Sequence, residues 1–273
     1  MSPWAVLPLV LAGIALMAGA LVLVLVLHKV RRIDLSTHEL RDNATATRRE
    51  VESLFAQVQS LMALERLLEL PRALPSMRGW AGSPDFLLAV AEQVLDHKPV
   101  TVVECSSGVS SLTIARCLQL NGRGHVYSLE HDAEYAKRTR EHLTRLGLSE
   151  WATVLDAPLT RGSDDMEWYA EMALPADLPP IELLVVDGPP ASDTPEARYP
   201  ALPRLLPRFA KSFTIMLDDA NRPGERAVVA RWRSLEADLT EERVPCEKGL
   251  TVLRRQSADV HATTKRLSPD CLP

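Results

Sequence analysis

Acidic side chains follow two apolar runs of this 273-residue chain, each at the point where a buried strand would end. Asp187 follows IELLVV, and Asp218 and Asp219 follow FTIML. Because the parallel strands of a doubly wound sheet end at one edge, these three carboxylates should lie side by side there. Carboxylates at such an edge can accept a proton from a substrate hydroxyl or bind Mg²⁺. The first candidate chemistry is therefore proton transfer or metal binding by aspartates.

Two glutamates end earlier runs of the same kind. Glu104 closes the β-branched run VTVV at 100–103, and Glu130 closes HVYSL at 125–129. Glu130 comes 26 residues after Glu104, near the spacing at which a doubly wound fold places the acid that binds a ribose. Its carboxylate can accept hydrogen bonds from both ribose hydroxyls. We therefore interpret Glu130 as a cofactor-binding residue rather than as a solvated acid at a strand end.

The turn between the first strand and the following helix narrows the class of ligand. It consists of small residues at 105–108, and an apolar pattern with helical spacing follows it. Ser110 or Ser111 can cap this helix, whose N-terminal amides attract an anionic group. A dinucleotide pyrophosphate needs G-x-G-x-x-G, whereas Gly108 is the only glycine of the turn. The turn thus counts against an NAD- or nucleotide-dependent enzyme, which stays an alternative.

The pattern Glu104-x-Ser106-x-Gly108-x-Ser110 resembles motif I of the class I S-adenosylmethionine (SAM) methyltransferases, usually written E/D-x-G-x-G-x-G. Together with VYSLEHDAEYA, LLVVDGPP and MLDDANRPGE, it is similar to the bacterial methyltransferase-24 branch over about residues 77–255. The resemblance implies a Rossmann-like, doubly wound seven-stranded α/β sheet with a reversed last hairpin. It also implies SAM over the carboxyl ends of the strands, with Glu104, the turn residues Ser106, Gly108 and Ser110, and Glu130 as cofactor-binding residues.

A further cofactor candidate follows the third expected strand, at 151–155. In class I methyltransferases the loop after this strand faces the adenine, so the resemblance makes Asp156 a candidate for cofactor binding. The expected order continues with strands at 181–186 and 213–217 and a terminal hairpin around 243–253. The stretch at 161–180 is interpreted either as a crossover helix with a lid-like loop or as plain surface packing.

The three aspartates also resemble the metal site of metal-dependent O-methyltransferases, which have an Asp after the fourth strand and an Asp-Asn pair after the fifth. This resemblance implies Mg²⁺ bound by Asp187, Asp218 and Asp219, with Asp in place of Asn at the last position. The alternative is a metal-free site, in which Arg198 or Arg222 neutralises the acids and one aspartate acts as the base. Asp187 and Asp218 are the catalytic candidates under either interpretation.

The N-terminal segment predicts a membrane anchor. Residues 4–27 form an apolar run without charge, long enough to cross a hydrocarbon core of roughly 30 Å. Lys29, Arg31 and Arg32 follow it, so the positive-inside rule places the rest of the chain in the cytoplasm. We expect a single-pass protein of the inner (plasma) membrane, in contact with the lipid bilayer through residues 4–27. A cleaved signal peptide is the alternative.

The remaining division of the chain follows from its pattern of apolar residues and prolines. We expect an anchor at 1–28, a juxtamembrane helical stalk at 29–71, the methyltransferase domain at 72–255 and a disordered tail at 256–273. An apolar seam along the stalk contains Val51, Leu54, Val58, Leu61 and Leu68. It would either pack against the catalytic domain or form a weak homodimer.

Composition excludes other classes of function. The net charge is −5 and the basic residues are scattered, so we expect no nucleic-acid partner. The four cysteines show no CxxC spacing, which argues against a zinc site and a disulfide framework. The sequence therefore predicts a membrane-anchored, cytoplasm-facing SAM-dependent O-methyltransferase that acts on a small-molecule or saccharide-like acceptor. The alternative from another class is a membrane-anchored SAM-binding scaffold without activity.

Overall fold

The computed structural model describes residues 3–77, 82–162, 165–190 and 196–256, with the side chains of 3–10, 12, 14–15, 18, 33–46 and 49 left out. The chain divides into two units, residues 1–55 and 56–273. Helix α1 (Pro3–Leu68) makes up the first unit and continues into the second, which contains all other elements. The expected disordered tail at 256–273 lies, apart from Gln256, outside the described residues.

A seven-stranded mixed sheet with strand order β3-β2-β1-β6-β7-β9-β8 forms the centre of the second unit. The first five strands of that order are parallel, and β9 runs antiparallel to β7. This confirms the expected doubly wound sheet with a reversed last hairpin. The strands are β1 (Thr101–Cys105), β2 (His125–Glu130), β3 (Ala152–Asp156), β6 (Ile181–Val186), β7 (Phe209–Leu217), β8 (Thr240–Val244) and β9 (Leu250–Arg255).

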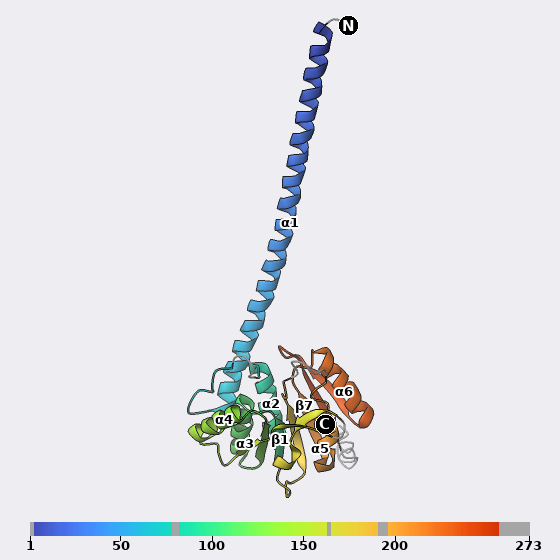
Figure 1. Cartoon of the computed structure of the whole chain (residues 1–273). Coiled ribbons are helices and arrows are strands. Elements are labelled where there is room, and N and C mark those ends of the chain that lie inside the picture. The colour runs from blue at the N-terminus through green and yellow to red at the C-terminus, as the bar shows by residue number, and fades with distance from the viewer. Residues whose placement is uncertain (1–2, 78–81, 163–164, 191–195, 257–273) are drawn as a thin grey trace, which may run out of the picture. The chain divides into compact units, whose positions relative to one another are not determined.

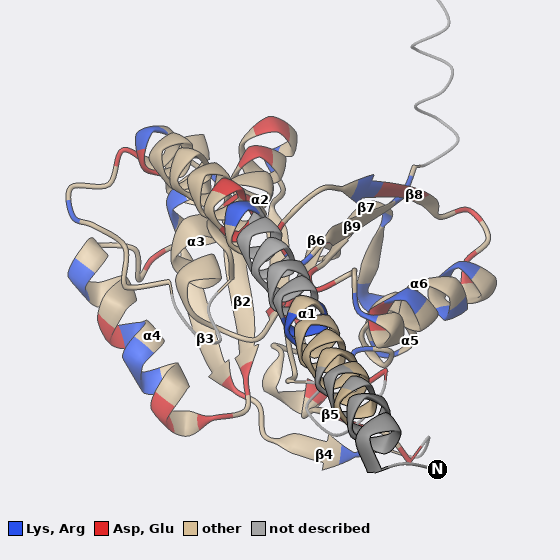
Figure 2. Cartoon of the chain, turned by 90° about the horizontal axis from the view of Figure 1, so that it is seen from above, with Lys and Arg blue, Asp and Glu red and all other residues tan. Residues whose placement is uncertain are grey.

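Helices cover both faces of the sheet (Figure 1). One face packs against α2 (Pro84–His97), α3 (Val109–Asn121) and α4 (Ala133–Leu146). The other packs against α5 (Ala201–Leu205) and α6 (Pro223–Leu235). Neighbouring residues of β1 point to opposite faces of the sheet: Val102 packs in the core with α2, α3 and α4, and Val103 packs in the core with α5 and α6. A strand buried on both faces explains the unbroken β-branched run in the sequence. Charged residues lie along α4 and α6 (Figure 2).

The C-terminal turns of α1 are part of the second unit's core. Leu64 and Leu68 are fully buried among the residues of α2 and α3. The Arg116 guanidinium of α3 donates to the Leu68 carbonyl oxygen over 2.6 Å and so satisfies a carbonyl group at the helix end. Packing against the catalytic domain is thus confirmed for Leu68, whereas Val51 and Leu54 on the first unit are exposed.

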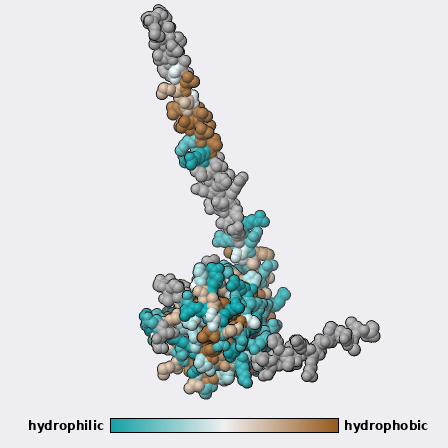
Figure 3. Space-filling view, turned by 90° about the vertical axis from the view of Figure 1, so that its right-hand side faces the viewer, coloured by the Kyte–Doolittle hydropathy of each residue, from teal (hydrophilic) through white to brown (hydrophobic). Residues whose placement is uncertain are grey.

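Within the described part of the chain, no helix is both long enough and apolar enough to cross a membrane. Some side chains of the expected span, residues 4–27, lie outside the described ones. The described side chains from Leu21 to Leu27 of α1 are exposed, and they form a hydrophobic band in Figure 3.

Two local expectations differ from the structure. The stretch at 161–180 contains no crossover helix among its described residues. Instead, β4 (Leu159–Arg161) pairs with β5 (Glu167–Tyr169) as a small antiparallel hairpin, and Trp168 and Tyr169 are buried. Gly108, rather than Ser110 or Ser111, occupies the N-cap position of helix α3. Helix α6 begins at Pro223, which suits the first position of a helix because proline lacks the N–H donor.

Candidate active site

A cleft of about 380 Å³ lies at the carboxyl ends of the parallel strands. Residues of the β1–α3 turn, the end of β2 and the loops after β6 and β7 line it, as expected for a ligand site of a doubly wound sheet. Among the residues predicted from the sequence, the cleft is lined by Ser106, Gly108, Ser110, Glu130, Asp187 and Asp219. Glu104, Asp156 and Asp218 are not among its lining residues.

The turn after β1 depends on two residues with positive φ. Gly108, at φ +149°, is the N-cap of α3, and a Cβ there would meet no atom of the described residues within 4 Å. The space above Gly108 is therefore open toward the cleft that this residue lines. Ser106 has φ +108°, although its Cβ disfavours that region. This explains physically why the motif usually has glycine at the position of Ser106.

Glu104 lies beneath this turn and holds it. Its side chain is fully buried, and Oε2 accepts hydrogen bonds from the hydroxyls of Ser111 (2.5 Å) and Ser128 (2.6 Å). The Ser111 hydroxyl also accepts a hydrogen bond from the Gly108 amide over 3.1 Å. Burial raises the pKa of Glu104, and the serine hydroxyls act against that rise. In this structure Glu104 therefore positions Gly108 and lies outside the cleft lining.

Glu130 lines the cleft as expected. Its Oε2 accepts a hydrogen bond from the Ser107 hydroxyl (2.8 Å), and Oε1 accepts one from the Asp132 amide (3.1 Å). His131 Nδ1 lies 3.1 Å from the same Oε1 atom. Burial works to raise the pKa of Glu130, but the hydrogen bonds from His131, Asp132 and Ser107 hold it below its ordinary value. Glu130 is thus a fixed carboxylate at the wall of the cleft.

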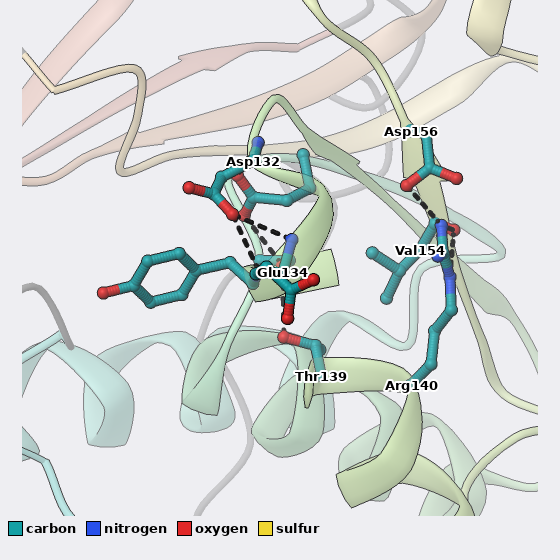
Figure 4. A network of polar contacts seen from close by, with 9 residues as sticks. Asp132, Glu134, Thr139, Arg140, Val154 and Asp156 are labelled. Atoms are coloured by element: carbon teal, nitrogen blue, oxygen red, sulfur yellow. Dashed lines mark hydrogen bonds and ion pairs between the residues drawn. The ribbon is translucent and has the colours of Figure 1, made fainter. Parts of the chain in front are cut away.

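Asp156, expected to bind the cofactor, lies outside the cleft lining. It ends β3 beside Glu130 on β2, yet its side chain is 63% exposed and forms an ion pair with Arg140 of α4 over 2.9 Å. Figure 4 shows the Arg140 guanidinium between Asp156 and the Val154 carbonyl oxygen, to which it donates over 2.8 Å. The arginine reaches over the strand end because α4 packs on this edge of the sheet. The structure thus gives Asp156 a surface ion pair outside the cleft.

The three aspartates come together as predicted. Carboxylate oxygens of Asp187, Asp218 and Asp219 lie within 4.8 Å of one another. Asp218 is fully buried, and neither of its side-chain oxygens has a hydrogen-bond partner in the described part of the protein. Burial, followed by the charge of Asp218, raises the pKa of Asp187 well above its ordinary value. Burial and the charge of Asp219 likewise raise the pKa of Asp218.

Arg198 is buried among these acids. Its Nη2 lies 2.8 Å from Asp219 Oδ2 and 3.9 Å from Asp187 Oδ1, and its Nη1 lies 3.8 Å from Glu225 Oε1. Burial works to lower the pKa of Arg198, but Asp187, Asp219 and Glu225 raise it above its ordinary value. Arg222 adds a second cation, 3.0 Å from Asp219 Oδ1. The metal-free arrangement left open by the sequence thus has its counter-charges in place.

Comparison with known proteins agrees with this geometry. Residues 103–220 match the model of a family described as a methyltransferase domain. The chain carries a class I SAM-dependent methyltransferase domain. This methyltransferase has no match among curated proteins.

Solved structures share its fold. The SAH-bound methyltransferase PaMTH1 of Podospora anserina is 14% identical with a TM-score of 0.53, and the match covers 78% of this chain and 96% of that one. The N-terminal domain of human METTL16 in complex with SAH is 13% identical with a TM-score of 0.51, and the match covers 72% of this chain and 80% of that one.

The residues of the cleft fit SAM, the cofactor of this enzyme. The open space above Gly108 can take a ligand that approaches the backbone, and Glu130 presents a carboxylate to which a ligand hydroxyl can donate. When bound, SAM supplies an electrophilic methyl group on a sulfonium. The residues of the chain would orient the cofactor and the acceptor for displacement in line, which can account for roughly 7–11 kcal/mol of barrier lowering.

Several cleft residues were missed by sequence reasoning. Tyr135, Arg138, Thr139 and His142 of α4 line the cleft, and Ser107 lies 3.2 Å from the Thr139 hydroxyl. Their spacing of three and four residues, directly after the acid that ends β2, places them on one helix face and was the signal available. Lys248, in the loop between β8 and β9, also lines the cleft. No motif marks that lysine, because only the tertiary fold brings it to the site.

Proposed function

We propose that this methyltransferase transfers the methyl group of SAM to a hydroxyl of a small-molecule or saccharide-like acceptor, with Asp187 as the proton acceptor. The observation that carries the proposal is the position of Asp187, which follows β6 and lines the cleft beside the Ser106–Ser110 turn, where its amide donates to the Cys105 carbonyl oxygen over 3.2 Å. A hydroxyl acceptor must lose its proton, and a carboxylate with a raised pKa is a stronger base than an ordinary one. Asp218 supports Asp187 from the buried side rather than meeting the acceptor itself.

The test measures SAM binding and methyl transfer separately. Calorimetry with the full chain should detect SAM binding in the wild type and in Asp187→Asn. Formation of S-adenosylhomocysteine, measured with a panel of hydroxylated small molecules, should occur with the wild type and not with Asp187→Asn. A matched control is Asp238→Asn, a change at an acid outside the cleft lining. SAM binding without transfer to any acceptor would favour the scaffold alternative, and full activity of Asp187→Asn would exclude Asp187 as the base.

We also propose that residues 4–27 anchor the chain in the inner membrane, with the methyltransferase domain in the cytoplasm. The supporting facts are the uncharged apolar run, the basic residues Lys29, Arg31 and Arg32 after it, and the exposed apolar side chains Leu21–Leu27. The full chain should sediment with membranes, a chain without residues 1–28 should not, and a reporter fused after Pro273 should behave as cytoplasmic. A soluble full chain would contradict the anchor, and a reporter outside the cytoplasm would contradict its orientation.

We propose a second copy of this chain as the partner of an apolar stripe on the first unit. Val51 and Leu54 of α1 are 62% and 63% exposed, and Phe55 beside them is exposed as well. Apolar residues at this spacing suit a helix pair, in which each would pack against its counterpart. Light scattering should show a dimer for the full chain and a monomer for Val51→Lys/Leu54→Lys. A monomeric wild type would refute the partner.

A further inference from the structure

The cluster of Asp187, Asp218 and Asp219 has oxygen ligands that would suit a divalent cation by chemistry alone. Mg²⁺ prefers carboxylate oxygens and water in octahedral geometry, at about 2.0–2.1 Å. The carboxylate oxygens of the three residues lie within 4.8 Å of one another. Whether a metal ion fits depends on what else lies among those oxygens.

A cation of the chain itself already lies there. The Arg198 side chain is only 3% exposed, and its Nη2 contacts Asp219 at 2.8 Å and approaches Asp187 Oδ1 at 3.9 Å. A guanidinium keeps its proton inside proteins. It therefore remains charged beside the aspartates, where it would repel a divalent ion that shared the same oxygens.

Backbone carbonyls also hold Arg198 in this position. Nη2 donates to the Asp187 carbonyl oxygen over 2.6 Å, and Nη1 donates to the Asp218 carbonyl oxygen over 2.9 Å. These two carbonyls belong to the loops after β6 and β7, so one side chain joins both strand ends. A metal ion that bound only the carboxylates would leave these two carbonyl oxygens without the N–H donors that Arg198 supplies.

The oxygens of Asp219 have cationic neighbours on both sides. Arg198 contacts Oδ2, and Arg222 lies 3.0 Å from Oδ1. A metal ion that used Asp219 as a ligand would share its oxygens with two guanidinium groups and would be repelled by both. The donor set therefore does not fit a divalent cation while Arg198 stays in place.

We propose that Arg198 is the resident cation of this site, in place of a metal ion, and that it acts as the positioning residue that holds Asp187 at the cleft. The methyltransferase then binds no divalent cation at the three aspartates. This inference concerns cation binding, and it holds whether or not Asp187 is the base that removes the acceptor's proton.

The experiment measures cation binding directly. Mn²⁺, added as the probe, should remain free in electron paramagnetic resonance spectra of the wild-type full chain. Arg198→Met removes the guanidinium and leaves the aspartates. This variant should bind Mn²⁺, and Mg²⁺ should raise its melting temperature while leaving that of the wild type unchanged. Arg226→Met is the matched control, since Arg226 is an exposed arginine on α6, and it should behave as the wild type.

Two results would overturn the proposal. One is Mn²⁺ binding by the wild type that disappears in Asp219→Asn. The other is a folded Arg198→Met variant, shown to bind SAM, that takes up no Mn²⁺. If Arg198→Met does not fold, the titrations of the wild type and Asp219→Asn decide, since Mn²⁺ binding that Asp219→Asn abolishes refutes the proposal and its absence supports it. SAM binding is measured independently, so failure here leaves the assignment of methyl transfer intact.

Discussion

Replacement of Glu130 by alanine should weaken SAM binding, and the number of free hydrogen-bond sites on the Glu130 carboxylate sets the size of the loss. An ionised carboxylate offers about four lone-pair sites. The Ser107 hydroxyl, the Asp132 amide and His131 Nδ1 lie at three of them. One site is left for a ligand hydroxyl, and one hydrogen bond to a charged group contributes about 1.5–3 kcal/mol. Glu130→Ala should therefore weaken binding by roughly ten- to a hundredfold.

Calorimetric titration of the full chain with SAM measures this effect. Asp156→Ala is the matched control, because it removes an acid from the end of the neighbouring strand, paired with Glu130 in the register of β2 and β3. Its carboxylate lies outside the cleft lining, so SAM affinity should remain unchanged. Unchanged affinity of Glu130→Ala would refute the assignment of Glu130 to the cofactor. An equal loss in Asp156→Ala would show that the cofactor extends over β3.

Three further predictions concern stability. Ser106→Gly should raise the free energy of unfolding by about 1 kcal/mol in denaturant titrations, because φ +108° strains a residue with a Cβ and glycine relieves that strain. Leu68→Ala should lower it by about 2–5 kcal/mol, because Leu68 is fully buried, whereas Met172→Ala, at a side chain that is 97% exposed, should change it by less than about 0.5 kcal/mol. The hydrogen bond with Glu130 raises the pKa of His131 above 6.5, so its stabilisation is complete below pH 6.5 and is lost as the pH rises through the folded-state pKa. A His131→Gln variant should lack this pH dependence in thermal unfolding.

The order of elements was predictable because each signal was local. Short apolar runs ending in acids marked β1, β2, β6 and β7, and both ends of α4 have residue types typical of helix caps, Asp132 at the N-cap and Gly147 at the C-cap. Asp132 accepts hydrogen bonds from the amides of Glu134 and Tyr135, and Gly147 has φ +68°. The meeting of Asp187, Asp218 and Asp219 followed from topology alone.

The ion-pair partners of the acids and the burial of some aromatic side chains could not be predicted from the sequence, because they depend on tertiary contacts. Asp156 and Glu130 both end strands, and only the packing of α4 decides that Arg140 reaches the first and not the second. The sequence offered Arg198 and Arg222 equally as partners of the acids. Burial separates them, since Arg198 lies inside the cluster and Arg222 at its surface. Trp168 and Tyr169 could not be assigned to the core either, because their strand is only three residues long.

Mass spectrometry of the ligand retained by the purified full chain is the most direct test of the assigned cofactor. Glu130 at the wall of the cleft and the single glycine in the β1–α3 turn predict that the retained molecule is SAM or S-adenosylhomocysteine. The molecule should disappear from the Glu130→Ala protein after the same purification. Recovery of NAD or another nucleotide carrying a pyrophosphate would contradict the account.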